Sequence, residues 1–374
     1  MTDAEPGDVA ARITWGQALA WRMRRQHLTR RAGPTQLLPV ATRICGLHAQ
    51  IMSSAELSVW ARIDNLDRGA VHDALWTRRE LVKLWAMRGT LHLLPAAELG
   101  LWLGAFASYR HYGLTHPAIL DLVTHVGNAL DGTLLTRAEL AAQIQRRTGS
   151  TATSDLIHES WGSYLKPVSL RGQLCFAPGD GQRVRFTHPA SWVPGGVEHV
   201  DEAPALARAT RAFLGAFGPA EPRDLARWWG VGPARAQRML NALGPDAVPV
   251  DVSGDRCWIL TEHLPELTTT APTRTVRLLP AFDQWVVNAS RTTPAQLAPQ
   301  HRDRVYRPQG WISPALLVGG RISGTWTSRR VGRRLLIEIT PFGRLTDTVR
   351  RRAEAEADRL ATYLSRTPDI TWQD

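Results

Sequence analysis

Residues 208–259 decide the fold class, and their segments read RATRAFLGAF (208–217), PRDLARWW (222–229), ARAQRMLNAL (234–243) and VPVDVSGDRCWI (248–259). The first three segments have helical spacing and are separated by Gly-Pro breaks, and Pro222 suits the first turn of a helix. Apolar residues alternate on both sides of the turn Ser253-Gly254-Asp255, which predicts a hairpin. Three helices followed by a hairpin is the order of a winged helix, whose third helix commonly enters a DNA groove.

The same order of elements recurs upstream. Thr136-Arg137-Ala138-Glu139 is a capping box that opens a helix. A second helix is expected from near Ser154 towards Lys166, and residues 174–186 are expected to form a wing around the turn Pro178-Gly179-Asp180-Gly181. A less regular copy is expected in the N-terminal third, with helices at 15–30, 37–50 and 74–87. The chain therefore predicts tandem winged helices.

The last third of the chain has a different pattern. Strands are expected at 276–279, 315–318, 321–327 and 335–339, and an amphipathic helix at 347–364. The polar stretch 288–309 is expected to be a surface excursion. We therefore predict an α+β protein in which a C-terminal β-domain follows the winged-helix modules. The expected boundaries are 12–125, 126–200, 201–265 and 266–374.

The charge of the chain predicts an anionic partner. The net charge is +11, and Lys83 and Lys166 are the only lysines. A GC-rich coding sequence explains arginine in place of lysine, but it leaves the excess positive charge unexplained. Arginine suits phosphate because its planar fork bonds it bidentately. Nucleic acid is therefore the favoured partner.

The segment TSRRVGRR (327–334) is the best candidate for gripping DNA. It joins two alternating stretches and has no acid, so it predicts a hairpin that enters a groove or clamps phosphates. A solvated turn that protects a sheet edge is the alternative. Arg235 and Arg238 on the third central helix are further candidates for phosphate contacts. The hairpin's own candidates are Arg329, Arg330, Arg333 and Arg334.

Several functional classes are disfavoured. Cys45, Cys175 and Cys257 are widely spaced, which disfavours disulfides and zinc ribbons. There is no H-E-x-x-H, P-loop or G-x-G-x-x-G motif, so we expect no metal and no nucleotide or other cofactor. Residues 1–5 lack the features of a signal peptide, and no apolar run approaches the ~20 residues that span a bilayer. We therefore expect a cytoplasmic protein that does not contact membranes and associates with the nucleoid when it acts on DNA.

Five segments together resemble a known family. They read GLHAQ (46–50), RGTLHL (88–93), LLPAFDQW (278–285), GWISP (310–314) and GRISGTW (320–326). Their order and spacing resemble the AlkZ group of winged-helix DNA glycosylases, from about Ile13 to about Leu364. The resemblance implies a C-shaped arrangement of tandem winged helices with a C-terminal β-domain. It also implies a monomer that excises alkylated purines from double-stranded DNA, in some members antibiotic adducts as self-resistance.

The catalytic motif of this family is Gln-apolar-Gln, with Gln-apolar-Asp in a housekeeping branch. The matching positions here are His48-Ala49-Gln50, so the second polar residue matches and the first departs. The change resembles the variant branch linked to trioxacarcin-type intercalating alkylators. The substrate implied is a bulky N7-alkylguanine of the trioxacarcin or azinomycin type.

The chemistry accommodates this variant. Alkylation at guanine N7 makes the base a good leaving group, and the sugar passes through an oxocarbenium-like state. An imidazole, with an ordinary pKa of about 6.5, accepts a proton from the attacking water, and an amide donates and accepts at once. We hypothesise that His48 is the general base or a water ligand and that Gln50 orients the water. A hydrogen-bonded structural role is the alternative for His48.

Asp283 is the third catalytic candidate, because it is one carboxylate in an apolar run. It would support the oxocarbenium or hold an arginine of the β-domain. A lyase needs an accessible amine. Lys83 is expected in an apolar helix and Lys166 precedes a proline, so we expect a monofunctional glycosylase.

Two other functions fit the sequence. A winged-helix transcriptional regulator would bind an operator, usually as a dimer, and would be indifferent to mutation of His48. A protein that binds lesions without cutting them is the second alternative. For the glycosylase we expect a shallow, open site beside His48 and Gln50, since a large intercalating adduct would not fit a closed base pocket.

Overall fold

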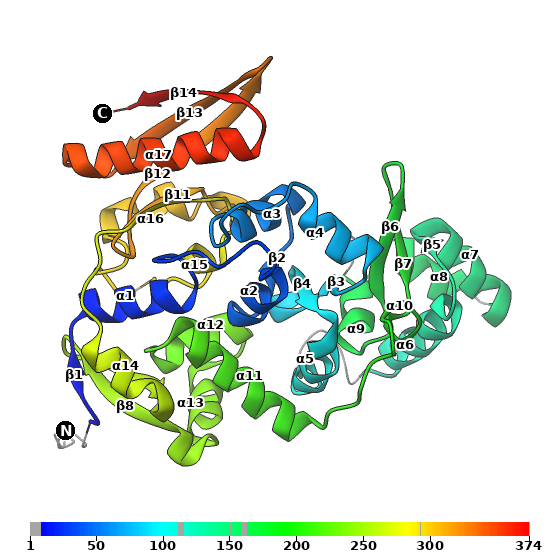
Figure 1. Cartoon of the computed structure of the whole chain (residues 1–374). Coiled ribbons are helices and arrows are strands. Elements are labelled where there is room, and N and C mark those ends of the chain that lie inside the picture. The colour runs from blue at the N-terminus through cyan, green and yellow to red at the C-terminus, as the bar shows by residue number, and fades with distance from the viewer. Residues whose placement is uncertain (1–8, 111–115, 150, 159–162, 292, 374) are drawn as a thin grey trace. The chain divides into compact units, whose positions relative to one another are not determined.

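The computed structural model describes residues 9–110, 116–149, 151–158, 163–291 and 293–373 (Figure 1). Contacts within the chain divide it into two compact units. Met1–Arg68 and Thr210–Asp374 form the first unit, and Gly69–Ala209 form the second. Both units contain helices and strands, so the predicted α+β class is confirmed. The division is coarser than the four predicted modules, whose boundaries stay a prediction.

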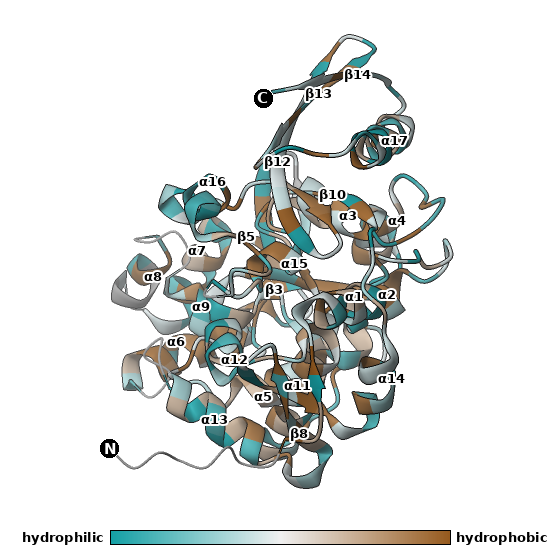
Figure 2. Cartoon of the chain, turned by 90° about the vertical axis from the view of Figure 1, so that its left-hand side faces the viewer, coloured by the Kyte–Doolittle hydropathy of each residue, from teal (hydrophilic) through white to brown (hydrophobic). Residues whose placement is uncertain are grey.

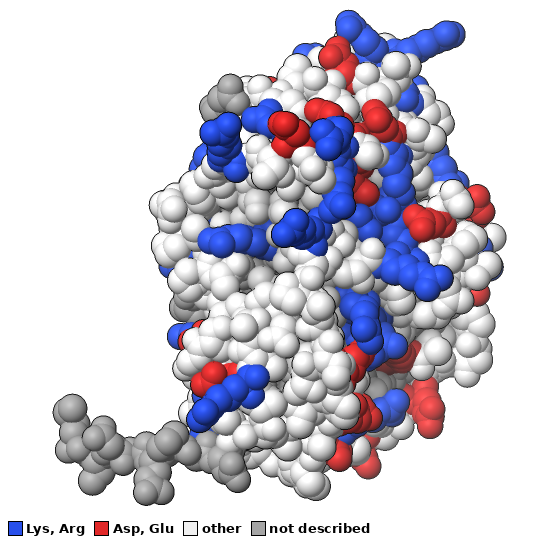
Figure 3. Space-filling view, turned by 60° about the vertical axis from the view of Figure 1, so that its left-hand side comes forward, with Lys and Arg blue, Asp and Glu red and all other residues white. Residues whose placement is uncertain are grey.

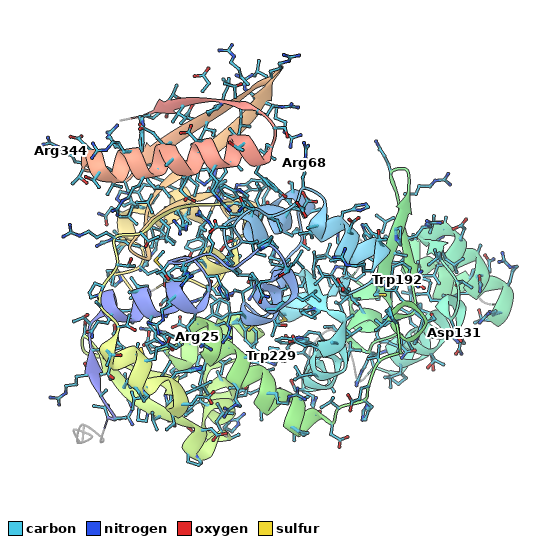
Figure 4. All side chains as sticks on the ribbon, in the orientation of Figure 1. Arg25, Arg68, Asp131, Trp192, Trp229 and Arg344 are labelled. Atoms are coloured by element: carbon cyan, nitrogen blue, oxygen red, sulfur yellow. The ribbon has the colours of Figure 1, made fainter. Side chains whose placement is uncertain are left out.

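The central stretch has the predicted order of elements. Helix α12 begins at Pro222, and Gly230 ends it in the left-handed conformation with φ 78°. Trp228 and Trp229 are buried, and the ring of Trp228 lies 5.0 Å from Phe213, so both tryptophans belong to the core as expected. The elements are α11 (Glu202–Phe217), α12 (Pro222–Trp229), α13 (Pro233–Asn241), β8 (Ala247–Val252) and β9 (Asp255–Leu260). Figure 4 shows Trp229 among packed side chains of these helices.

The N-terminal segment of the first unit joins this hairpin. Strand β1 (Arg12–Ile13) pairs parallel to β8, and the sheet order is β1-β8-β9. Thr14 and Gln17 form a capping box that starts α1 (Trp15–Arg25). The apolar face of α1 packs with β8 and β9 in one core cluster that includes Trp21, Val250 and Ile259. Helices α2 (Leu37–Arg43) and α3 (Met52–Trp60) and the short strand β2 (Leu47–His48) follow α1.

The C-terminal part of the first unit is built on a five-stranded sheet. Its order is β10-β11-β12-β13-β14, antiparallel except for β13 and β14, which run parallel. Helix α17 (Asp347–Tyr363) packs on β10 and β14. Hydrophobic residues gather around β10 and α15, as Figure 2 shows. The elements are α14 (Leu264–Thr269), β10 (Val276–Leu279), α15 (Gln284–Val287), α16 (Arg302–Val305), β11 (Ala315–Val318), β12 (Arg321–Val331), β13 (Arg334–Pro341) and β14 (Thr367–Trp372).

The second unit has its own apolar core. Buried hydrophobic residues from several elements between Trp85 and Phe186 form one cluster. In this cluster the ring centroids of Trp85 and Phe176 lie 4.9 Å apart. The capping box predicted at Thr136 and Glu139 is present and opens α7. Strands β3 and β4 pair antiparallel, and β5, β7 and β6 form a sheet in that order. The elements are α4 (Ala70–His72), β3 (Leu81–Trp85), β4 (Leu91–Pro95), α5 (Leu99–Phe106), α6 (Pro117–Leu130), β5 (Leu135–Thr136), α7 (Arg137–Thr148), α8 (Thr151–His158), α9 (Leu165–Leu170), β6 (Cys175–Asp180), β7 (Arg183–Thr187) and α10 (Pro189–Trp192).

All three helices predicted in the N-terminal third are wrong in part. The expected helix 15–30 ends at Arg25. The expected helix 74–87 is a π-helical turn followed by strand β3, because a short apolar run has no period that separates strand from helix. The expected helix 37–50 ends at Arg43, since Cys45 (φ 59°) and Gly46 (φ 87°) are left-handed. The helix predicted from Ser154 to Lys166 is split between α8 and α9, and residues 159–162 lie outside the described ranges.

The C-terminal predictions need two corrections. The stretch 288–309 is not simply a surface excursion, because Ser290, Thr293 and Gln296 are at most 4% exposed. The backbone N–H of Ser290 donates to Gln296 Oε1 at 3.2 Å, and Thr293 Oγ1 donates to Ser290 Oγ at 3.0 Å. Such mutual hydrogen bonds allow polar side chains to be buried. Strand β14 was missed because its burial does not alternate.

None of the helices in the described ranges combines the length and the apolar composition that a bilayer span requires. The three cysteines are buried and carry free thiols.

Helix α17 is fixed to the sheet by a buried carboxylate. Arg31 Nη2 lies 2.6 Å from Glu356 Oε1, and Arg277 Nη1 lies 3.4 Å from the same oxygen. Burial lowers the pKa of Arg277, and the negative charge of Glu356 opposes that shift. One carboxylate on α17 therefore compensates two buried guanidinium groups.

Glu356→Ala is expected to lower the free energy of unfolding by about 3 kcal/mol, because it removes the counter-charge of the buried Arg277 and leaves Arg31 with only Asp64, 3.7 Å away. Urea unfolding followed by circular dichroism measures this. Asp358→Ala, on the exposed side of the same helix, is the control and is expected to change stability by less than about 0.5 kcal/mol. Equal effects of the two variants would contradict the role of Glu356.

Candidate active site

The predicted motif lies on β2 and in the bend that follows it. His48 ends the strand and is 6% exposed, Ala49 is fully buried, and Gln50 is exposed in the bend before α3. The left-handed pair Cys45 and Gly46 turns the chain from α2 into this strand. The side chain of the second motif residue therefore reaches solvent, while the imidazole lies in the protein.

The side chain of Gln284 fixes the start of this segment. Its Nε2 donates to the carbonyl oxygen of Gly46 at 2.9 Å, and its Oε1 accepts from Asn288 Nδ2 at 2.9 Å. Gln284 is 1% exposed, so solvent does not compete with these hydrogen bonds. Helix α15 therefore holds the segment that carries His48, although the two are far apart in sequence.

Phe282 sets the orientation of the His48 ring. The two rings are stacked, with centroids 5.2 Å apart and planes inclined by 5°. Phe282 has a left-handed backbone with φ 58°, which is uncommon for a bulky residue and persists only where its surroundings enforce it. Trp311 is a second aromatic neighbour of Phe282, in an edge contact with ring centroids 5.3 Å apart. His48 is therefore held by packing rather than free to rotate.

Asp283 is fully buried, and both of its oxygens have donors. Oδ2 accepts from Arg62 Nη1 at 2.7 Å, and Oδ1 accepts from Arg62 Nη2 at 2.8 Å and from the backbone N–H of Trp285 at 2.9 Å. The carboxylate therefore caps the N-terminus of α15 and pairs bidentately with an arginine that is itself fully buried. Of the two roles considered for Asp283, this geometry matches the arginine partner, although the arginine comes from the N-terminal segment rather than from the β-domain.

The buried pair is part of a larger network. Arg62 also donates to the Ser58 carbonyl at 2.9 Å and to Gln26 Oε1 at 3.2 Å. Gln26 in turn donates to the Ala216 carbonyl at 2.9 Å. The network joins the ends of α1, α3 and α11 to the start of α15. Charges with this many donors and acceptors are tolerated in a dry interior.

The candidate DNA-binding arginines lie on two exposed surfaces. The hairpin predicted at 327–334 is present, since β12 pairs with β13 up to Val331 and Arg334, and Gly332 has φ 58°. All four of its arginines are exposed, and Arg334 donates to Asp369 at 3.1 Å. On α13, Arg238 is exposed and Arg235 is half-buried. Figure 3 draws one face of the molecule, on which Lys and Arg side chains extend from the top of the view downward, with Asp and Glu among them.

The two lysines have different surroundings. Lys83 is on β3, its Nζ lies 5.4 Å from the ring centroid of Phe176, and burial lowers its pKa. Lys166 lies on α9. The described residues contain no group of three or more His, Cys, Asp or Glu side chains placed to hold a metal ion.

Comparison with known proteins identifies the class of protein. Residues 41–363 match the family described as DNA glycosylase AlkZ-like. The chain belongs to this family, whose members are DNA repair glycosylases acting on DNA.

A named protein and a solved structure, both from Streptomyces sahachiroi, make the likeness more specific. One is named interstrand DNA cross-link repair glycosylase and is 35% identical over 377 residues, which cover 96% of this chain and 98% of that protein. The other is the solved structure of DNA glycosylase AlkZ, which superposes with a TM-score of 0.87 at 35% identity and covers 97% of this chain and 100% of that one. Family membership therefore agrees with the resemblance found in the sequence.

The residues that orient the motif were not singled out from the sequence. They are Arg62, Phe282, Gln284 and Trp311. The run LLPAFDQW did carry a signal, since it places a carboxylate and an amide among apolar residues at the end of a strand. No local pattern marks Arg62, because its partner lies 221 residues away.

Asp283→Ala is expected to destabilise the protein by about 3–5 kcal/mol, because it leaves Arg62 charged and buried without a partner. Thermal and urea unfolding measure the effect. Asp369→Ala, which removes an exposed ion pair, is the control and is expected to cost less than about 1 kcal/mol. Undiminished stability with loss of activity would instead indicate a direct catalytic role for Asp283.

Proposed function

We propose that this protein hydrolyses the N-glycosidic bond of bulky N7-alkylated guanine in double-stranded DNA, with adducts of the trioxacarcin or azinomycin type as substrates. The observation that carries the proposal is the arrangement of the motif. A packed imidazole at His48 stands two residues from an exposed amide at Gln50, in a chain that belongs to a glycosylase family. The cross-link repair named for the Streptomyces relative is consistent with a bulky alkylated substrate.

The proposed reaction breaks the bond between C1′ and N9. The bonding electrons move to the base and neutralise the positive charge that alkylation placed on it, so the base leaves without strong acid help. Water bonds to the oxocarbenium-like C1′ and gives its proton to His48. The amide of Gln50 directs the lone pair of the water towards the sugar.

The packing around His48 supports this division of roles. A base that is already oriented does not lose orientational freedom in the transition state, which is the advantage of a preorganised site. Gln284 supplies that orientation from the start of α15, and Phe282 and Asp283 supply it from the loop between β10 and α15. We therefore propose Asp283 as a positioning residue.

We further propose that the segments made of helices followed by a hairpin act as tandem winged-helix modules in a C-shaped arrangement. We also propose that the protein acts as a monomer without a cofactor. The order α11, α12, α13, β8, β9 supports the winged-helix assignment of the central module.

The exposed arginines of the β12–β13 hairpin, with Arg235 and Arg238, are the proposed phosphate contacts. We also propose self-resistance to a DNA-alkylating natural product as the biological role.

His48→Ala and Gln50→Ala are each expected to slow base release from duplex DNA carrying a defined N7-alkylguanine adduct by about 10²–10⁴-fold. DNA affinity should persist, and the product strand should stay intact until alkali cleaves it, as for a monofunctional enzyme. Single-turnover assays with a methyl and an intercalating adduct measure this. Release that is unchanged in both variants would reject the assigned site. Binding without release by the wild type would favour a lesion-binding protein.

The double variant Arg329→Ala, Arg330→Ala is expected to weaken DNA binding at low salt and to reduce the slope of log K against log [salt] by about 2, because each phosphate contact contributes about 0.9. Fluorescence anisotropy over a salt series measures the slope. Arg351→Ala, an exposed arginine of α17, is the control and should leave the slope unchanged. Identical slopes for both variants would exclude the hairpin from phosphate contact.

A further inference from the structure

A pocket of about 650 Å³ lies beside the loop that carries Phe282. Helices α3 and α16, the end of β10 and strand β12 contribute to it, all within the first unit. The residues that line it include Leu57, Pro280, Arg304, Arg307, Trp311 and Ser328. Its volume is within the range that holds a small organic ligand.

Trp311 presents an indole ring at this pocket. It is 41% exposed and is the one aromatic residue among the large hydrophobic side chains exposed in the described part of the chain. Gln309 (φ 59°) and Gly310 (φ 76°) form a tight turn, which the backbone N–H of Arg307 closes on the Trp311 carbonyl at 2.9 Å. The exposed ring is therefore held in place by its own loop.

The pocket is connected to the candidate catalytic residue by aromatic contacts. The ring of Trp311 touches Phe282 at 5.3 Å, and Phe282 stacks on His48 at 5.2 Å. Along these contacts, a group bound against Trp311 is separated from His48 by the rings of Trp311 and Phe282.

The charge of the lining favours an anion. Arg304 and Arg307 are exposed there, and Asp303 is the one acidic residue of the lining. The guanidinium of Arg304 lies 4.9 Å from the ring centroid of Phe342, which restricts its position. An aromatic face beside two arginines is the combination that proteins use for single-stranded nucleotides, with the base stacked and the phosphate paired.

We propose that this pocket binds one unstacked nucleotide of the substrate DNA, with its base against Trp311 and its phosphate at Arg304 and Arg307. The nucleotide comes either from the lesion strand or from the opposite strand, displaced while the lesion is engaged. The inference rests on the proposed glycosylase function, which supplies the DNA. It assigns a binding role to residues outside the His48-Ala49-Gln50 motif.

The test uses duplexes that contain a tetrahydrofuran abasic analogue, which cannot react, so binding is measured without catalysis. Trp311→Ala is expected to raise the Kd by roughly 5- to 100-fold, the range for loss of one base stack. Trp311→Phe should restore most of the affinity, because phenylalanine keeps a stacking face. Arg307→Ala should lower the salt slope by about 1, while Arg351→Ala should not.

The fluorescent base 2-aminopurine identifies the nucleotide. It is placed beside the abasic analogue in one duplex and opposite it in another, and stacking on Trp311 quenches its emission. Quenching by wild type that is lost in Trp311→Ala supports the proposal and names the strand. An unchanged Kd and unchanged emission for Trp311→Ala, with unfolding like that of the wild type, would overturn it. Absence of base release from alkylated duplexes would instead contradict the glycosylase function, independently of these binding results.

Discussion

The buried ion pair between Arg62 and Asp283 is the constraint on which the site depends. Both side chains are fully buried, so their hydration is lost, and only the bidentate pair with its additional hydrogen bonds offsets that cost. The pair joins the end of α3 to the start of α15, and Gln26 extends the network to α1. Because Asp283 follows Phe282 directly and precedes Gln284, the same interaction sets the two residues that hold the His48 segment.

This arrangement gives the two proposed catalytic residues different surroundings. The imidazole of His48 packs against an aromatic ring, and Gln50 lies at the surface where DNA is expected. A histidine in the first motif position is therefore compatible with the fold, since the neighbouring packing orients a flat ring well. The arginines also differ in their surroundings. Those of the β12–β13 hairpin are exposed, whereas the arginine of the network, Arg62, is buried and paired with Asp283. The exposed guanidinium groups of the hairpin can reach phosphate, although that of Arg334 also pairs with Asp369, whereas the buried ones stabilise the scaffold.

The Arg62–Asp283 network, the His48-Ala49-Gln50 motif and the β12–β13 hairpin all belong to the first unit. The sheet with α17 carries the hairpin, and Arg344 extends outward beside the start of that helix (Figures 1 and 4). Glu356 anchors the helix through two arginines, so the sheet is linked by charge to the N-terminal segment. The chain's excess of arginine therefore serves two physical purposes, since some guanidinium groups carry surface charge and others join distant elements of the scaffold.

The sequence alone determined the elements whose signals are local. Capping boxes, Gly-Pro breaks and alternating strands predicted α7, α12, β8, β9, β10 and β11, because such signals act within a few residues. The five family segments also located the His48-Ala49-Gln50 motif. Tertiary structure decided what depends on distant partners: the strand at His48, the strand β3 in an apolar run, the added strand β14, and the burial of Ser290 and Gln296. Arg62 finds Asp283 only when the chain folds, because pairing between residues 221 positions apart leaves no periodic trace in the sequence.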